Sequence, residues 1–382
     1  MKLWFNGNIF VWIAFLLFIP PLSGAESSLQ TTNQLRRGFY YFHDEIPQGP
    51  WSVHGVKIDR HNSSFELHTT LAKSNHFGLT LLTEQIKSLP VSYGKPVAAI
   101  NGDYYSNSGP YTGDPKGLQI MRGELISGPC DWTCFWMDPA GAPQMTNVIS
   151  RFEAVLHNNL IIPFALNEER SPGSAVLYTT AVGASSHVSG GIELILEKEG
   201  TGPWLPLQPA RKYTARIREI RKTGDTPITT NTMVLSVGPE LLEKYPSLSQ
   251  IAAGGIVTLS THTLPDLIDV KTAIGGGPAL VRNGKPMPRK EANVRHPRSA
   301  IGWNADYLYM MVVDGRQINL SVGMTYQELA DYMIKLGCVE AMSLDGGGST
   351  TFWAYGQVMN NPSEGRERGM ANALVLVRKE NK

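Results

Sequence analysis

Cysteine is scarce in this sequence. Three cysteines, Cys130, Cys134 and Cys338, occur in 382 residues. Two closely spaced cysteines without neighbouring histidines make a poor zinc site, so a zinc-stabilised module is not expected. The pair in "CDWTC" could instead close a small disulfide loop in an oxidising compartment. Cys338 stands in the apolar run "LGCVEAMSL" and is expected to be a small buried hydrophobic residue.

Excess charge of either sign is also lacking. The chain has 34 Lys and Arg against 33 Asp and Glu, and the basic residues are scattered. Nucleic acid is therefore not expected as a partner, because duplex-binding proteins usually concentrate basic residues on one face. Hydrophobic residues make up 42% of the chain, which is typical of a packed globular protein.

Long hydrophobic runs are limited to the first residues. The run "IFVWIAFLLFI", Ile9–Ile19, is short for a bilayer span. Lys2 precedes it, and the small residues Ser23 and Ala25 suit a cleavage site. We therefore expect a secretory signal peptide at 1–25, with an uncleaved anchor as the alternative. Cleavage would give a secreted, periplasmic or cell-surface protein without a transmembrane segment. Oligomeric state is not indicated.

Several catalytic motifs are missing. The sequence has no H-E-x-x-H and no G-x-S-x-G, so zinc-hydrolase and serine-hydrolase interpretations lack support. Its glycine-rich runs match neither the Walker A loop nor G-x-G-x-x-G, which argues against ATP and dinucleotides. No metal ligands are assigned, although Asp side chains and loop carbonyls leave a calcium ion as an open alternative.

Short strands dominate the expected secondary structure. Between about 150 and 272, strand-length apolar or alternating runs are bounded by Gly, Pro or Asn. The clearest helix follows Thr325, which forms a capping box with Glu328, and ends before Gly337. Buried strands precede and follow it, giving a strand–helix–strand unit. A shorter helix is predicted in "LLTEQIKSLP", with Thr83 as its N-cap.

Three segments share one layout: "VAAINGDYY" followed by "GLQIMRGELI", then "KTAIGGGPALVRNGKPM", and "EAMSLDGGGSTTFWAYGQVM". Each has an apolar strand, a glycine-rich bend and a hairpin. The hairpin-turn glycines are Gly123, Gly284 and Gly356. Since hairpins resemble one another, true repetition stays open. Either way, Gly102, Gly275–Gly277 and Gly346–Gly348 fall at equivalent strand ends. If these strand ends converge in the fold, their backbone amides line one common opening.

These features predict an α+β fold. It would contain a β-rich mixed sheet, or a partly closed barrel, of Gly-bend hairpins with a few helices. We expect an N-terminal segment at 26–90 and one domain at 91–382. The β-rich region at about 150–272 would extend that domain.

Three aspartates follow predicted strands and abut glycine: Asp103, Asp314 and Asp345. A glycosidase needs carboxylates that flank the bond it breaks. The structural alternative is that Asp-Gly is a common turn dipeptide. Asp345 is the exception, because a simple turn does not require all three of Gly346–Gly348.

Anion-binding groups accompany these aspartates. Glycine-rich backbone can form a nest of N–H groups, and an arginine binds phosphate through a planar fork of donors. Arg298 and Arg368 each lie beside a predicted strand, where solvated loop charge is the alternative. His296, a loop histidine before proline, is expected to be structural.

In order and spacing, "NGDYY", "AIGGGPALVRNGK", "HPRSAIGW", "VVDGRQ", "SLDGGGSTTFW" and "NPSEGRERGMANALVLV" resemble the phosphodiester glycosidase family, which includes exopolysaccharide-related bacterial members. The resemblance covers about 95–380 and is strongest from 273 on. It implies a hydrolase that cleaves the C1–O bond between a sugar and a phosphodiester oxygen. The partner would be a small or polymeric carbohydrate phosphodiester, and the products a free sugar and a phosphomonoester.

The expected roles follow from this reaction. Asp345 would be the nucleophile or general base, Asp314 would orient or complete the pair, and Asp103 would contact sugar hydroxyls. Arg298 and Arg368 would hold the phosphate. The other expected binding residues are Asn101, Gly276, Gly277, Gly346, Gly347, Gly348, Ser349 and Thr350. Two alternatives stay open: a non-catalytic carbohydrate-binding protein of exopolysaccharide assembly, and an ordinary O-glycosidase that does not use phosphate.

Overall fold

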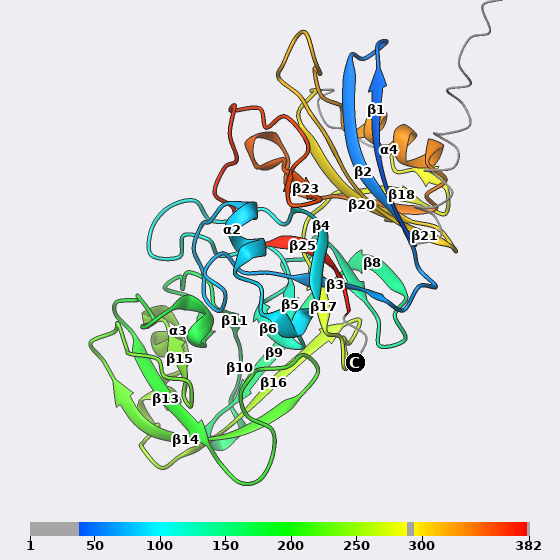
Figure 1. Ribbon diagram of the computed structural model, residues 1–382. Helices are drawn as coiled ribbons and strands as arrows, with labels where there is room; N and C mark the ends of the chain where they lie inside the picture. The colour runs from blue at the N-terminus through cyan, green and yellow to red at the C-terminus, as the bar shows by residue number, and fades with distance from the viewer. Residues whose placement is uncertain (1–37, 289–293, 380–382) are drawn as a thin grey trace, which may run out of the picture. The chain divides into compact units, whose positions relative to one another are not determined.

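The computed structural model describes residues 38–288 and 294–379 (Figure 1). The predicted signal peptide at 1–25 lies outside the described residues. The chain divides into two units, Met1–Tyr40 and Tyr41–Lys382, and the features below belong to the second, except that the first strand begins at Phe39 in the first unit. Across the described ranges, no helix has the length and apolar character needed to cross a bilayer.

The first sheet has seven strands, and one helix packs against it. In spatial order the strands are β1 (Phe39–Ile46), β2 (Trp51–Asp59), β21 (Tyr307–Val313), β20 (Arg298–Trp303), β22 (Glu340–Ser343), β18 (Ala279–Arg282) and β19 (Lys285–Pro286). Helix α4 (Tyr326–Lys335) contacts β18 and β19. Its N-terminus carries the predicted capping box between Thr325 and Glu328.

The predicted strand–helix–strand unit is confirmed. β21 leads into α4, which leads into β22. Both strands pair antiparallel with β20, which lies between them, so β21 and β22 run parallel. Buried Leu329 and Met333 of α4 join the core under this sheet.

Two five-stranded sheets follow. One has the order β24 (Gln357–Val358), β23 (Phe352–Ala354), β4 (Lys95–Asn101), β25 (Ala373–Arg378) and β3 (Phe65–Thr69). Helix α2 (Leu82–Lys87) contacts β4 and β25. The other has the order β6 (Glu124–Ser127), β5 (Gln119–Met121), β17 (Thr272–Ile274), β7 (Thr133–Met137) and β8 (Pro143–Asn147).

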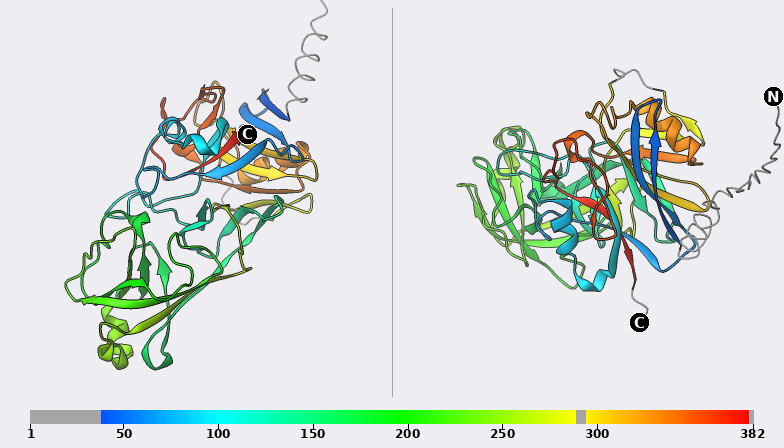
Figure 2. Two further views of the ribbon diagram at one scale, coloured as in Figure 1. Left: turned by 60° about the horizontal axis from the view of Figure 1, so that its bottom comes forward. Right: turned by 45° about the horizontal axis from the view of Figure 1, so that its top comes forward.

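The region predicted to be β-rich forms an eight-stranded sheet. Its order is β10 (Ile161–Pro163), β9 (Ile149–Val155), β16 (Ile256–Leu264), β14 (Lys212–Arg221), β13 (Ile192–Lys198), β15 (Met233–Val237), β12 (Ala175–Tyr178) and β11 (Ala165–Leu166). These strands, green in Figure 2, curve around a buried aliphatic core and nearly close like a barrel. Helix α3 (Pro239–Lys244) follows β15. Short 3-10 turns are η1 (Val91–Tyr93), η2 (His157–Asn159), η3 (Thr180–Val182), η4 (Pro246–Gln250) and η5 (Gly347–Ser349).

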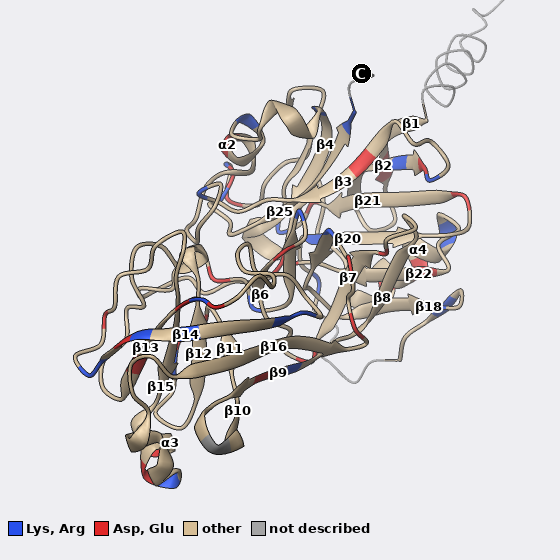
Figure 3. Ribbon diagram, turned by 90° about the horizontal axis from the view of Figure 1, so that it is seen from below, with Lys and Arg blue, Asp and Glu red and all other residues tan. Residues whose placement is uncertain are grey.

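The fold class is therefore α+β, β-rich with few helices, as predicted. Basic and acidic positions are interspersed over the elements in Figure 3. The three predicted hairpins are also present, joining β5 to β6, β18 to β19 and β23 to β24. Both central residues of each turn have positive φ, for example 49° at Asn283 and 71° at Gly284. This is the type I′ geometry that matches the twist of paired strands.

The cysteines differ in part from expectation. All three are free thiols, so the disulfide considered for Cys130 and Cys134 is not formed. Cys134 lies in β7 within the hydrophobic core, and its thiol donates to the Trp132 carbonyl at 3.4 Å. Cys338 is buried, as expected.

Candidate active site

The glycine-rich strand ends converge, which was the condition for a single amide-lined opening. The Asp345 N–H, after β22, donates to the Gly102 carbonyl, after β4, at 2.9 Å. The Gly277 N–H, after β17, donates to the Ser343 carbonyl at 2.8 Å. Bends from three different sheets are thus joined by backbone hydrogen bonds around Asp345.

The glycine triplet is required by close approach. A Cβ atom at Gly346 would lie 2.7 Å from the Pro297 carbonyl oxygen, a backbone atom that cannot move aside. Gly347 has a φ of 62°, a conformation that side chains disfavour. A Cβ atom at Gly348 would overlap the Arg368 guanidinium. Because glycine has no side chain, the bend can pack directly against the Pro297 carbonyl and the Arg368 guanidinium.

The predicted amide nests are mostly closed. Gly346 donates to its neighbour, the Asp345 carboxylate, at 2.8 Å. Gly347 donates to the Pro297 carbonyl at 2.9 Å, and Gly277 is already bonded to Ser343. These three N–H groups are therefore engaged inside the protein, which corrects the expectation that they face an anion. The charge for anion binding must come mainly from side chains.

Asn101 fixes the bend. Its Nδ2 donates to the Asp345 carbonyl at 2.7 Å. Its Oδ1 accepts from the Ser299 hydroxyl at 2.6 Å and from the Thr351 N–H at 3.2 Å. With only 1% exposure, Asn101 is a positioning residue that links β4, β20 and the Gly bend.

Asp345 sits in a partly desolvated place. Burial raises its pKa, while the hydrogen bond from the Gly346 N–H and the charge of Arg368 oppose the rise. Ser349 and Thr350 are buried in the same bend. Among the described residues, the hydroxyls of Ser349, Thr350 and Thr351 have no hydrogen-bond partner.

Asp103 is a second, deeper carboxyl group. Burial raises its pKa to about 7, and the negative charge of Asp345 contributes to this rise. Hydrogen bonds from the N–H groups of Gly117, at 2.7 Å, and Tyr104, at 2.8 Å, act in the opposite direction. The negative charge of Asp345 thus acts on Asp103, whose raised pKa lets it hold a proton near neutral pH.

Asp314 lies in a separate buried network. It accepts hydrogen bonds from the Asn360 side chain at 2.9 Å, the Asn361 N–H at 3.0 Å and the Ser52 hydroxyl at 3.2 Å. The His54 imidazole is 3.5 Å away. Asn360 also donates to the Thr350 carbonyl at 3.2 Å, so Asp314 reaches the Gly bend through Asn360.

Arg298 is 7% exposed and held in place. Its Nε donates to the Met324 carbonyl at 2.9 Å, and one Nη donates to the Val294 carbonyl at 3.1 Å. The guanidinium lies 3.8 Å from the Tyr326 ring centre, a cation–π contact. Its backbone lies beside Gly346. Arg298 therefore supplies a fixed positive charge with few free donors.

Arg368 is the more accessible cation. Its side chain is 42% exposed and forms an ion pair with Glu364 directly against Gly348. The hydrogen bond from Arg368 is the main cause of the lowered pKa of Glu364, and the charges of Arg316 and Arg366 add to it. Glu364 is therefore a carboxylate held among three arginines.

Arg316 completes this cationic group. A Cβ atom at Gly347 would lie 3.0 Å from Nη2 of Arg316, and Nη2 lies 3.4 Å from Nδ1 of His296. Burial and the charges of Arg298 and Arg316 lower the pKa of His296. A neutral His296 next to these arginines can accept a proton or a hydrogen bond.

A cavity of about 400 Å³ adjoins the Gly276–Pro278 bend. Three aromatic residues line it, Tyr104, Trp132 and Tyr326. The hydroxyls of Tyr104 and Tyr326 are 3.4 Å apart, and Trp132 meets Tyr104 edge to face with 6.0 Å between ring centres. The volume falls in the usual range for small-ligand sites.

Sequence reasoning missed several residues here. Arg316 and Glu364 were not singled out, although both stand in the motifs "VVDGRQ" and "NPSEGRERG". Their charge beside Asp-Gly and Gly-rich turns was the available signal. Tyr326 and Trp132 carried no signal, since nothing local shows that they face the bend. The described residues contain no group of three His, Cys, Asp or Glu side chains placed to hold a metal.

The sequence was compared with models of known protein families. The family model for phosphodiester glycosidases matches residues 215–377. This range contains Arg298, Asp314, Asp345 and Arg368 but not Asn101 or Asp103. It is narrower than the 95–380 expected from the sequence motifs.

One curated relative is the SPbeta prophage-derived uncharacterized protein YomE of Bacillus subtilis. It is 37% identical over 103 residues, which cover 25% of this chain and 16% of YomE. The chain therefore spans well under two thirds of that relative.

Two solved structures show a similar fold. A hypothetical protein from Synechocystis has a TM-score of 0.71 at 17% identity, over 89% of this chain and 62% of the other. A putative exported protein from Burkholderia pseudomallei has a TM-score of 0.65 at 18% identity, over 86% and 74% of the two chains. Residues 215–377 of this chain are therefore similar to the phosphodiester glycosidase family.

Proposed function

We propose that this protein is a secreted hydrolase that cleaves the glycosidic C1–O bond of a sugar-1-phosphodiester. The observation that carries the proposal is the position of Asp345, on a Gly bend flanked by the guanidinium groups of Arg316 and Arg368. A carboxylate beside accessible arginines suits a sugar carbon bonded to a phosphate oxygen. The family match and the exported structural relative support the reaction class and the secretion.

The phosphate would bind between Arg316 and Arg368. As the C1–O bond breaks, its electron pair passes to the phosphate oxygen, and the positive side chains stabilise the charge that develops there. Phosphate leaves readily with such help, so a strong general acid is less necessary than for an ordinary glycoside. Arg298 donates to backbone carbonyls, so it would contribute its positive charge without direct hydrogen bonds from those donors to the phosphate.

Asp345 would act at C1. It would either attack C1 itself, with water releasing the sugar in a second step, or take the proton of a water that attacks C1. Retention of anomeric configuration indicates the first course and inversion the second. Asp103 would hold a proton near neutral pH, and the loss of its negative charge would remove a repulsion that disfavours the ionised form of Asp345.

The remaining predicted residues would position these groups. Asp314, through Asn360, would fix the Thr350 end of the bend, and Asn101 would fix the Asp345 end. The sugar would lie in the cavity lined by Tyr104, Trp132 and Tyr326, because aromatic rings and hydroxyls suit a sugar face. The ion pair between Glu364 and Arg368 would break when phosphate binds to Arg368.

The test compares two substrate panels. The protein is incubated with sugar-1-phosphodiesters of several sugars and with nitrophenyl glycosides of the same sugars, and free sugar is measured. Release only from the phosphodiesters is the expected result. Release from the nitrophenyl glycosides alone indicates an ordinary O-glycosidase. Binding of the compounds by calorimetry without any release indicates a carbohydrate-binding protein, and either outcome overturns the proposal.

A further inference from the structure

Two further cavities lie at the other end of the strands that carry the candidate active site. β4 runs from Lys95 to Asn101, a length of about 20 Å at 3.3 Å per residue. β17 begins just after Lys271 and ends just before Gly275, and β25 ends just before Lys379. The cavities have volumes of about 700 and 850 Å³ and share the lining residues Ser63, Glu66, Lys271 and Lys379. We call them together the Lys271–Lys379 groove.

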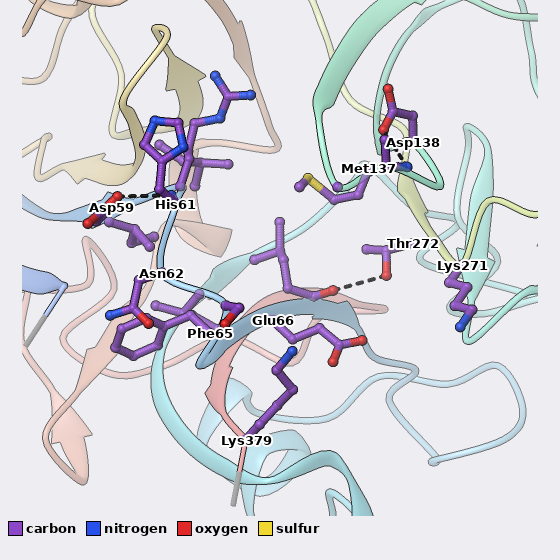
Figure 4. Close-up of a pocket in the computed structure, with 18 of the residues that line it drawn as sticks. Asp59, His61, Asn62, Phe65, Glu66, Met137, Asp138, Lys271, Thr272 and Lys379 are labelled. Carbon is purple, nitrogen blue, oxygen red and sulfur yellow. Dashed lines mark hydrogen bonds between the residues drawn. The ribbon is translucent and has the colours of Figure 1, made fainter. Parts of the chain in front are cut away.

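The groove is lined by slightly more basic than acidic side chains. Lys271, Lys379 and Arg122 line it, and with the residues that the structure describes none of the three forms an ion pair within 4 Å. Figure 4 shows the Glu66 side chain projecting between the two lysines. Glu66 is 44% exposed and lies 3.7 Å from His68.

The other two carboxylates of the groove are occupied. Asp59 accepts from the His61 N–H at 2.9 Å. Asp138 accepts from the Ala140 N–H at 2.9 Å and the Ala142 N–H at 2.8 Å, closing a turn. These carboxylates stabilise loop geometry and keep their negative charge, so the basic side chains of the groove (Arg60, Arg122, Lys271 and Lys379) outnumber its acidic ones (Asp59, Glu66 and Asp138) by one.

His68 provides an independent observation. It is 8% exposed and lines the groove, and among the described residues its Nε2 has no hydrogen-bond partner. A buried polar atom normally has one, and its absence costs about 1–3 kcal/mol. Burial lowers the pKa of His68, the negative charge of Glu66 opposes this shift, and the charges of Arg122 and Lys379 add to it. Its neutral ring is available to accept or donate one hydrogen bond to a ligand.

The walls suit a carbohydrate. The Tyr93 ring stacks at a tilt on His68 with 4.7 Å between centres, and Arg122 lies 4.7 Å from the same ring centre. The hydroxyl residues Ser63, Ser64 and Ser92 line the same cavity. Aromatic faces pack against sugar rings, hydroxyls bond to sugar hydroxyls, and the cations require an anionic substituent.

We propose that the Lys271–Lys379 groove is a second carbohydrate site that binds the anionic groups of a glycan chain. It lies apart from Asp345, so a chain held there would be anchored without being cut there. The proposal does not rest on the proposed hydrolysis, because binding at the groove needs no catalytic residue.

The probe is phosphorylated dextran, with unmodified dextran as the neutral control and carboxymethyl dextran to distinguish phosphate from carboxylate. Binding to the full chain is measured by affinity electrophoresis and calorimetry. The test variant is the pair Lys271→Gln and Lys379→Gln. The matched control is the pair Lys198→Gln and Lys222→Gln, which removes equal charge from exposed positions elsewhere.

We expect the wild type to bind at least one charged dextran more tightly than dextran, with binding that weakens as salt screens the charges. The test pair should lose about fivefold or more in affinity, and the control pair less than about twofold. His68→Ala, with both lysines intact, should also bind the charged dextran more weakly than the wild type does. Equal binding of neutral and charged dextran, or equal losses in both pairs, overturns the proposal. Release of sugar from a small phosphodiester should be the same in the test pair and the wild type.

Discussion

Arg368 and Glu364 form an ion pair packed directly against Gly348, the third glycine of the bend that follows Asp345. Glu364 is thus an internal carboxylate in the place where the proposed phosphate would meet Arg368. Arg316 and Arg366 also act on it. In the free protein Glu364 already pairs with Arg368, so the proposed substrate phosphate would have to displace Glu364 to bind there.

Glu364→Gln should therefore strengthen binding of anionic ligands. The neutral amide competes less for Arg368, and an exposed ion pair is worth about 0.2–1 kcal/mol. We expect the KM for a sugar-1-phosphodiester, or the Kd of inorganic phosphate, to fall about two- to threefold with little change in kcat. Calorimetry with inorganic phosphate gives the direct measurement. Weaker phosphate binding in this variant would show that Glu364 helps to position Arg368.

Asp345→Asn should abolish turnover while the fold is retained. The amide can neither attack C1 nor take a proton from water, so we expect a loss of about a thousandfold or more in kcat. Initial rates on the best phosphodiester provide the measurement, and the melting temperature monitors folding. Asp225→Asn, an exposed carboxylate after β14, is the matched control and should be fully active. An active Asp345→Asn enzyme would remove Asp345 from the chemistry.

Local features were predictable because neighbouring residues decide them. The α4 capping box needs only Thr325 and Glu328, three residues apart, and Gly284 completes a turn between adjacent strands. The Asp345 bend was found for a similar reason, since three consecutive glycines have few explanations other than close approach. Its hydrogen-bond partners, in contrast, come from the distant Gly102 and Pro297.

Predictions failed where a distant residue supplies the partner. Thr83 was expected to cap a helix, but α2 begins at Leu82 and the Thr83 hydroxyl bonds to Glu367. The expectation of open amide nests does not hold for two of the glycines. The Gly347 N–H donates to the Pro297 carbonyl and the Gly277 N–H to the Ser343 carbonyl, both from distant parts of the chain. No local pattern contains this information.

The pH dependence of stability should include a contribution from Asp103. Its folded pKa is raised from 3.8 to about 7, so between these values the folded state binds more protons than the unfolded state. Stability from this group is present below pH 4 and is lost as pH rises through 7, with a slope of about −1.4 kcal/mol per pH unit at most. The difference in unfolding free energy between wild type and Asp103→Asn, measured by urea denaturation at several pH values, isolates this contribution. A difference that is flat between pH 4 and pH 7 would mean that Asp103 stays ionised.

Asp314 should prove to be a positioning residue, which a conservative pair of variants can show. Asp314→Asn keeps an oxygen that can accept from Asn361, so it should retain at least about a tenth of the activity. Asp314→Ala leaves donors of Ser52, Asn360 and Asn361 unpaired in a buried place, and should lower the unfolding free energy by about 2–4 kcal/mol. Activity and urea denaturation of both variants are measured side by side. If Asp314→Asn is as inactive as Asp345→Asn while remaining as stable as the wild type, Asp314 belongs to the catalytic pair, because charge and not hydrogen bonding would then be what the reaction requires.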